Sequence, residues 1–272
     1  HLAESILLRV RRLLGERGLS DFRETQVDLV GTEATYGPHA RIHGTREVML
    51  RIACVHDDPR ALTLFGKELA QAATSNVPGI FGFAGGRPKP SPRVRLTSAL
   101  VSKALVPVRV DLGGESHTCA PLSVAPPAVT GALAEPGSAD AAPGLGATDT
   151  TVPLLRLAVA RSGDKGDHAN IGVMARRPEY LPFIRAALSE AAVAGHFAHV
   201  LHPSRGSVTR WDLPGFHALN FLLRHALGGG GVASLRMDSQ GKAFAQQLLD
   251  FPVPVPRALA DTLGTTTART PA

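Results

Sequence analysis

The stretch LLRLAVARSGDKGDHANIGVMARRPEYLPFIRAAL, residues 154–188, decides the fold. Its opening residues, Leu154–Val159, are apolar and favour a strand, and Ala169–Ala175 favours a second strand after a turn rich in Gly and Asp. From Pro178 to Ala194 the apolar residues recur at helical spacing. A strand–turn–strand–helix order predicts a small antiparallel sheet with helices against one face.

The chain beyond residue 188 continues this theme. The patterns predict a strand at 207–211 and then a helix from Pro214 to about Leu227, which ends at the four glycines 228–231. A strand at 232–237 and a helix at 238–249 follow. Prolines at 252, 254 and 256 allow an edge strand at most. We therefore expect a ferredoxin-like α+β sandwich with an antiparallel sheet at 152–256, followed by a flexible tail at 257–272.

The first part of the chain has a different order of elements. Its patterns predict helices at 2–18 and 59–73, the second capped by Asp58, and strands at 27–30, 48–54, 93–102 and 106–111. This order fits an α+β or α/β layer that lacks an opening strand. We expect residues 1–114 to form an incomplete α/β domain, which residues absent from this chain, or a partner subunit, would complete.

A composition break separates the two parts. Residues 115–151 are rich in Ala, Pro, Gly, Ser and Thr, with no apolar periodicity and hardly any charge. Such a segment buries too little apolar surface to offset its ordering entropy, which favours a linker. The alternative is a long ordered loop on the surface of a single domain.

Composition narrows the class of protein. The 272 residues are 44% hydrophobic, carry a net charge of +6 and contain two cysteines, Cys54 and Cys119. That cysteine count excludes a disulfide framework and fits a reducing cytoplasm. No apolar run is long enough for a membrane span, and neither a signal peptide nor a start methionine is visible in the sequence, which begins at His1. The arginines are scattered and aromatic residues make up only 5%, so we expect anionic small molecules as ligands rather than nucleic acid.

The densest group of ionisable residues lies between the two strands of the opening stretch. We expect Asp164, Asp167 or His168 to move a proton. The glycines at 163 and 166 allow a turn whose successive N–H groups bind an anion, assisted by four side chains that we assign to substrate binding, namely Arg161, Ser162, Lys165 and Asn170. Two alternatives stay open: a divalent metal on Asp164, Asp167 and His168, and a purely structural hairpin.

Two further clusters carry candidate residues. If 214–227 is a helix, His217 and Asn220 share a face near its positive end, where His217 serves as acid or base and Asn220 contacts substrate. A packed structural His217 is the alternative. In the loop GGRPKPSP, residues 85–92, prolines fix a segment that presents Arg87 to an anionic ligand.

Other patterns give no support for a metal or a cofactor. The spacing of His196, His199 and His202 invites a zinc site, but steps of three residues on a helix turn successive rings about 60° apart, too far for one metal. The glycines at 228–231 follow a predicted helix and so lack the context of a dinucleotide fingerprint. No serine hydrolase, P-loop or zincin motif occurs. We therefore predict neither a metal nor a cofactor.

The chain resembles the acyclic terpene utilisation (AtuA-like) family. The resemblance rests on ARSGDKGDHANIGVMARRPEYLPFIRAAL, WDLPGFHALNFLL and GGGGVASLRMDSQGKAFAQQLLDFPV for the family's ferredoxin-fold domain. It rests on VGTEATYGPHA, REVMLRIACVHDD and GGRPKPSPRVRL for the C-terminal part of the family's main α/β domain. The long N-terminal α/β portion, with its GAGFSGDR-like segment, has no counterpart here.

The resemblance implies a role in the breakdown of acyclic terpenoids such as citronellol and geraniol, through CoA thioesters of a geranyl-CoA carboxylase pathway. Two hypotheses follow. The first is a cytoplasmic enzyme of acyl-CoA or branched carboxylate catabolism, of hydratase or lyase type, active as a homo-oligomer or with a partner subunit. The second is a non-catalytic assembly or regulatory module that pairs through its ferredoxin-like sheet.

Overall fold

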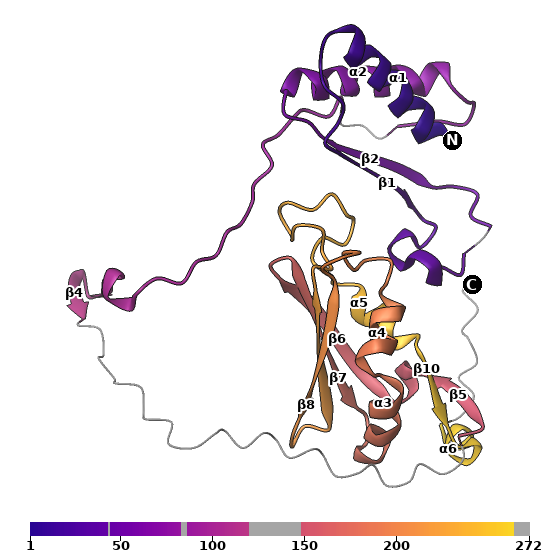
Figure 1. The fold of residues 1–272 in the computed structure, drawn as a ribbon, viewed down its shortest axis with the longest axis vertical. Coiled ribbons are helices and arrows are strands. Elements are labelled where there is room, and N and C mark those ends of the chain that lie inside the picture. The colour runs from indigo at the N-terminus through magenta and orange to yellow at the C-terminus, as the bar shows by residue number, and fades with distance from the viewer. Residues whose placement is uncertain (43, 83–85, 120–147, 264–272) are drawn as a thin grey trace. The chain divides into compact units, whose positions relative to one another are not determined.

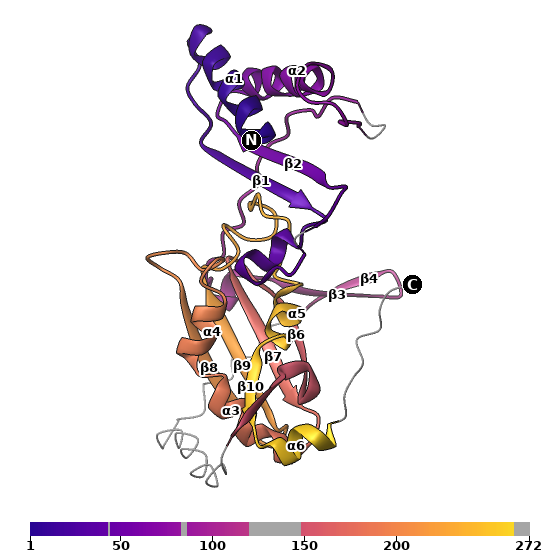
Figure 2. The same cartoon turned by 90° about the vertical axis from the view of Figure 1, so that its right-hand side faces the viewer.

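The computed structural model describes residues 1–42, 44–82, 86–119 and 148–263 (Figures 1 and 2). The chain divides into two compact units, one made of His1–Arg95 with Ala147–Ala272 and one of Leu96–Gly146. The described strands all pair antiparallel, so the fold mixes helices with antiparallel sheets. No described helix has the length and apolar character that crossing a bilayer requires.

Residues 1–95 hold one hydrophobic core. Its elements are α1 (Leu2–Glu16), β1 (Glu24–Val30), the 3₁₀ turn η1 (Ala34–His39), β2 (Met49–Val55) and α2 (Pro59–Ser75). Strands β1 and β2 pair along their whole length, and Ile6, Leu14 and Phe65 are among the buried residues of the two helices. The Asp58 carboxylate accepts the N–H of Arg60, which confirms the cap predicted for α2.

The unit Leu96–Gly146 holds the short 3₁₀ turn η2 (Lys103–Leu105) and a hairpin of β3 (Val108–Leu112) and β4 (Glu115–Cys119). Every residue of both strands is exposed. The strand predicted at 93–102 is wrong, because no strand forms there. The segment predicted as a linker, 115–151, contains all of β4 and the first residues of β5, and its residues 120–147 lie outside the described chain.

The C-terminal part contains the larger core. Its strands are β5 (Thr150–Pro153), β6 (Ala158–Lys165), β7 (His168–Ala175), β8 (Ser207–Leu213), β9 (Ala218–Arg224) and β10 (Pro252–Val255). Its helices are α3 (Leu181–Ala187), α4 (Glu190–His196), α5 (Phe244–Leu249) and α6 (Arg257–Thr262), with 3₁₀ turns η3 (Leu154–Arg156) and η4 (Pro178–Tyr180). Helix α6 occupies part of the segment predicted as a flexible tail.

The four-stranded sheet has the order β6-β7-β9-β8, two hairpins side by side. Helices α3, α4 and α5 lie against one face of it in both views (Figures 1 and 2). Strands β5 and β10 form a separate pair, so the proline-rich segment does form a strand, at the edge of a two-stranded sheet. The helix-facing side holds the core, in which Ile171, Leu219 and Phe221 are fully buried.

Two predicted elements of this part do not form, and the strand predicted at 154–159 begins as the 3₁₀ turn η3, with β6 starting only at Ala158. Residues 218–224 form strand β9 rather than a helix, because Leu219, Phe221 and Leu223 are buried at alternate positions and so follow the period of a strand. Gly215 and His217 have positive φ angles of 82° and 51°, which close a tight turn between β8 and β9 in place of a helix start. Residues 232–237 form no strand.

Candidate functional site

The turn between β6 and β7 is much shorter than the sequence suggests. Arg161 to Lys165 belong to β6 and pair with Gly172 to His168 of β7, so only Gly166 and Asp167 lie in the turn. The expected concavity of successive N–H groups along 161–166 is therefore wrong, because this backbone is extended and paired in the sheet. What the hairpin positions is a set of side chains at its tip.

Asp167, at that tip, is held by the segment that follows β9. Its carboxylate Oδ1 accepts the N–H of Gly229 at 2.6 Å, and its Oδ2 lies 2.8 Å from Nδ1 of His225. Its carbonyl oxygen accepts the N–H groups of Ala226 and Leu227. Burial works to raise the pKa of Asp167, but the hydrogen bonds from Gly229 and His225 outweigh it and the pKa is lowered. Asp167 is therefore an ionised acceptor at neutral pH.

His168 and His225 form an edge-to-face pair beside this carboxylate, with ring centroids 4.8 Å apart. The N–H of His225 donates to Nδ1 of His168 at 2.9 Å. Burial, and then the charge of His225, lowers the pKa of His168. The neutral His168 ring that accepts at Nδ1 carries its proton on Nε2. In the neutral form of His225 that donates from Nδ1 to Asp167, Nε2 is the nitrogen that can accept a proton.

The same hydrogen bonds speak against a metal on this cluster. Asp167, His168 and His225 offer ligand atoms within 4.8 Å of one another. His168 Nδ1 is already an acceptor and its Nε2 carries a proton, so His168 has no free lone pair for a metal. The two rings instead offer a substrate two different groups: Nε2 of neutral His225, which can accept a proton, and the Nε2–H of His168, which can donate a hydrogen bond.

Glycines allow the chain to close over the hairpin tip. Gly228, Gly229 and Gly230 have φ angles of 65°, 105° and 88°, a region that residues with side chains rarely adopt. A Cβ at Gly230 would lie 2.8 Å from the carbonyl oxygen of Gly166. His225 itself has φ 50°, a strained angle for a residue with a side chain. The glycine run thus brings the Gly229 N–H onto Asp167.

The sheet face away from the helices continues from this cluster. Alternation along the strands puts Arg161, Lys165, His168, Asn170 and Asn220 on that face. The amide of Asn170 donates to Oδ1 of Asn220 at 3.3 Å. Arg224 belongs to the same face and acts on the pKa of His168. Across the four strands, no outward-facing position carries an acidic residue.

The structure places the other predicted site residues elsewhere. Ser162 points to the helix side, where its hydroxyl donates to the Gly241 carbonyl at 2.6 Å and accepts the N–H of Ala245 at 2.9 Å. Asp164 lies 3.5 Å from Nζ of Lys242. His217 is in the β8–β9 turn, at the opposite end of the sheet from His168. Six residues of β7 separate those two ends, about 20 Å at strand spacing.

Arg87 and the His-rich segment also lie away from the Asp167 cluster. Arg87 lines an apolar pocket formed by residues of 2–88. Helix α4 ends at His196, whose Nε2 lies 3.1 Å from the Gln247 carbonyl, and His202 Nδ1 accepts the Ser204 N–H. Among the described residues, His196, His199 and His202 do not form a group suited to one metal ion.

Sequence reasoning missed His225, Arg224 and the role of the glycine run. The alternation of Leu219, Phe221 and Leu223 is the signal that would have identified β9. With β9 recognised as a strand beside β7, His225 falls next to the tip of the β6–β7 hairpin. The helix predicted over 214–227 concealed this relation.

Together, the fold and the cluster define a mixed α+β protein with a ferredoxin-like domain that carries an Asp–His pair at one end of its sheet. Two family models match the chain: "Acyclic terpene utilisation family protein AtuA" over residues 2–112 and "AtuA ferredoxin-like domain" over residues 152–254. These matches span most of the sequence, and the chain belongs to the AtuA-like family, whose description associates it with acyclic terpene utilisation. No curated protein and no solved structure gave a significant match.

Proposed function

We propose that the chain is part of a cytoplasmic enzyme of acyclic terpenoid or branched acyl-CoA catabolism, and that it acts on an acyl-CoA or carboxylate by hydratase or lyase chemistry. The observation that carries the proposal is the Asp167–His225 hydrogen bond of 2.8 Å, together with the His225 N–H that fixes the tautomer of His168. A carboxylate that orients a histidine in this way is a recurring device of acid–base catalysis.

His225 and His168 have different roles in the hydration of an α,β-unsaturated thioester. Nε2 of His225 takes a proton from water as the water oxygen bonds to C3. The displaced electron pair moves to the thioester oxygen, which accepts a hydrogen bond from Nε2–H of His168. The imidazolium of His225 then gives its proton to C2, while Asp167 stabilises the charge on the ring. The reverse sequence eliminates water.

The open sheet face supplies the complementary charge for such a substrate. Arg161, Lys165 and Arg224 place cations on the same face as His168, and Asn170 and Asn220 add amide groups. Phosphate groups of a CoA moiety, or a substrate carboxylate, are the anions that this face suits.

The test is turnover of a methyl-branched enoyl-CoA by the full chain and its variants, followed as loss of the conjugated thioester. His225→Gln should lower kcat about 100-fold or more, because general acid–base groups contribute on that scale. The matched control is His217→Asn, at the other end of the sheet, which should leave kcat within about twofold. Unchanged kcat in His225→Gln, with wild-type turnover present, contradicts the proposal.

A second candidate function rests on the other end of the same face. Val159, Met174, Trp211 and Leu213 are 40–47% exposed there, and Phe216 in the adjoining turn is 69% exposed. An exposed apolar patch of this kind favours pairing with a second copy or a partner subunit through the sheet. Trp211→Lys should abolish the self-association of the wild type in analytical ultracentrifugation. A monomeric wild type, or an association unaffected by Trp211→Lys, contradicts self-pairing through the sheet.

A further inference from the structure

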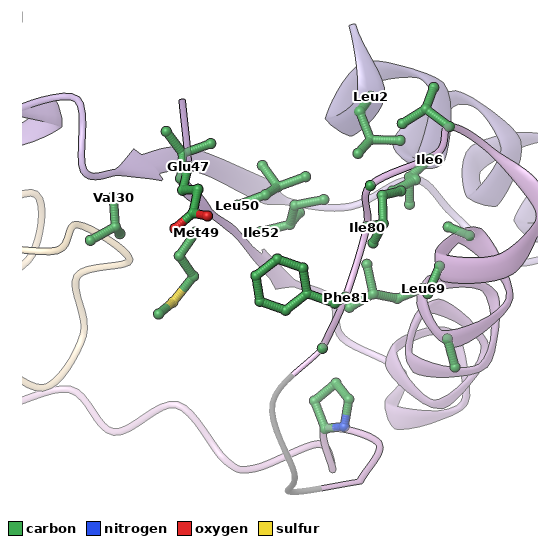
Figure 3. Close-up of a pocket in the computed structure, with 18 of the residues that line it drawn as sticks. Leu2, Ile6, Val30, Glu47, Met49, Leu50, Ile52, Leu69, Ile80 and Phe81 are labelled. Carbon is green, nitrogen blue, oxygen red and sulfur yellow. The ribbon is translucent and has the colours of Figure 1, made fainter. Parts of the chain in front are cut away.

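A large apolar hollow occupies the part of the chain before residue 89. Its volume is about 890 Å³, and α1, β2, α2 and the segment after α2 surround it (Figure 3). Pockets of a few hundred to about 1,000 Å³ are typical of small-molecule sites. None of the residues that line it belongs to the Asp167 cluster, so the pocket is a site distinct from that cluster.

Most of the lining is apolar. Ile6 of α1, Ile52 of β2 and Leu69 of α2 contribute side chains, and Ile80 and Phe81 come from the segment beyond α2. Figure 3 shows the Phe81 ring directed into the hollow, toward Met49 and Ile52. Phe81 is 76% exposed, which is unusual for so large an apolar side chain. Phe81 and its neighbours thus offer water an apolar surface that a ligand chain would cover.

A glycine inside α2 shapes one wall. Gly66 lies in mid-helix, where glycine costs about 1 kcal/mol relative to alanine. A Cβ at this position would lie 3.1 Å from the carbonyl oxygen of Pro88. The absence of that Cβ lets the segment 86–88 pack directly on the helix, which brings Arg87 to the pocket.

The charged residues of the lining are two cations, Arg46 and Arg87, and one anion, Glu47. Within the described chain, neither guanidinium takes part in an ion pair or a hydrogen bond. Two unpaired cations beside an apolar hollow complement an amphiphile that has an anionic end.

We infer that this pocket binds a medium-length apolar chain ending in a carboxylate or a phosphate, with the chain against Ile52, Leu69 and Phe81 and the anion at Arg87 and Arg46. The pocket and the Asp167 cluster share no residues, so ligand binding in the pocket does not depend on catalysis at the cluster.

Calorimetric titration of the full chain tests it with three probes of equal chain length: decanoate, decyl phosphate and decanol. Both anions should bind, and decanol should bind about tenfold more weakly, because it lacks the charge. Tighter binding of decanoate favours a carboxylate head group, and tighter binding of decyl phosphate favours a phosphate. Absence of binding by both anions, or equal binding of decanol, overturns the inference.

Matched variants separate the pocket from general surface effects. Ala70→Trp fills the pocket from an exposed position of α2 and should weaken decanoate binding at least tenfold, whereas Lys67→Trp, outside the lining, should not. Arg87→Gln should reduce the preference for decanoate over decanol, whereas Lys89→Gln should leave it unchanged. His225→Gln should still bind decanoate, which distinguishes this result from failure of the catalytic proposal. Equal effects within either matched pair contradict the pocket assignment.

Discussion

Single residues decide how the hairpin tip is built. Gly166 provides the positive φ of the two-residue turn, Asp167 accepts hydrogen bonds from the next segment, and the glycines at 228–230 allow that segment to approach. The sequence identified Asp167 and His168 as chemically important. It gave no indication that His225, distant in the chain, completes the group, because that relation depends on strand pairing.

Gly230→Ala should destabilise the protein by about 2 to 4 kcal/mol. The added Cβ would meet the Gly166 carbonyl oxygen at 2.8 Å, and φ 88° is strained for alanine. Gly195→Ala is the control, since its Cβ meets nothing within 4 Å and alanine favours helix α4. Urea unfolding measures both. Similar losses of stability for the two variants would exclude a specific contact at Gly230.

His196 should make stability depend on pH. Burial, and then the charge of His39, lowers its pKa from the ordinary 6.5 to about 4. Between these values the unfolded chain takes up a proton that the folded protein does not, so stability falls as pH is lowered from about 6.5 toward 4. The loss between pH 7 and 5 should be about 1 to 2 kcal/mol by urea unfolding.

His196→Gln should reduce this loss without removing it, because His168 and His199 also have lowered pKa values and act in the same direction. A variant with the full wild-type pH dependence would show that His196 does not contribute.

At the scale of elements, the prediction succeeded where the spacing of the apolar residues is clear. Helices α1 and α2 and strand β7 lie close to the predicted ranges. Strand β9 was missed because Asp212 and Pro214 imitate a helix start, whereas Gly215 and His217 form a turn. Local signals favour either element there, and packing of Leu219 and Phe221 against the helices selects the strand.

Substitution of neighbouring residues distinguishes the strand from the predicted helix. Phe221 is fully buried on the helix side of the sheet, so Phe221→Ala should cost about 3 to 5 kcal/mol. Leu222 faces the opposite side and is partly exposed, so Leu222→Ala should cost about 1 kcal/mol or less. Thermal and urea unfolding measure both. Comparable costs would contradict the alternation of β9.

At the scale of the whole molecule, buried apolar residues are distributed unevenly along the chain. Residues 1–95 and the C-terminal part each have a hydrophobic core, whereas the hairpin of β3 and β4 has no buried residue. A two-stranded hairpin without a core is marginally stable in water. The composition break after residue 114 indicated a change of character in this region, but not the hairpin that spans it.

Hydrogen exchange should show this contrast. Amides of β7 and β9, in the middle of the four-stranded sheet, should be protected to nearly the global free energy of unfolding. Amides of β3 and β4 should exchange within seconds at neutral pH. Protection of the hairpin comparable to that of β7 would show that another surface covers it.

The absence of carboxylates from the outward positions of β6, β7, β8 and β9 also has a kinetic consequence. Arg161, Lys165 and Arg224 produce a positive field above the sheet, which draws anions in during diffusion before any contact forms. Dissolved salt screens that field over about 10 Å at 0.1 M ionic strength. The encounter rate of a polyphosphorylated ligand with this face therefore falls as ionic strength rises, while that of a neutral ligand stays nearly constant.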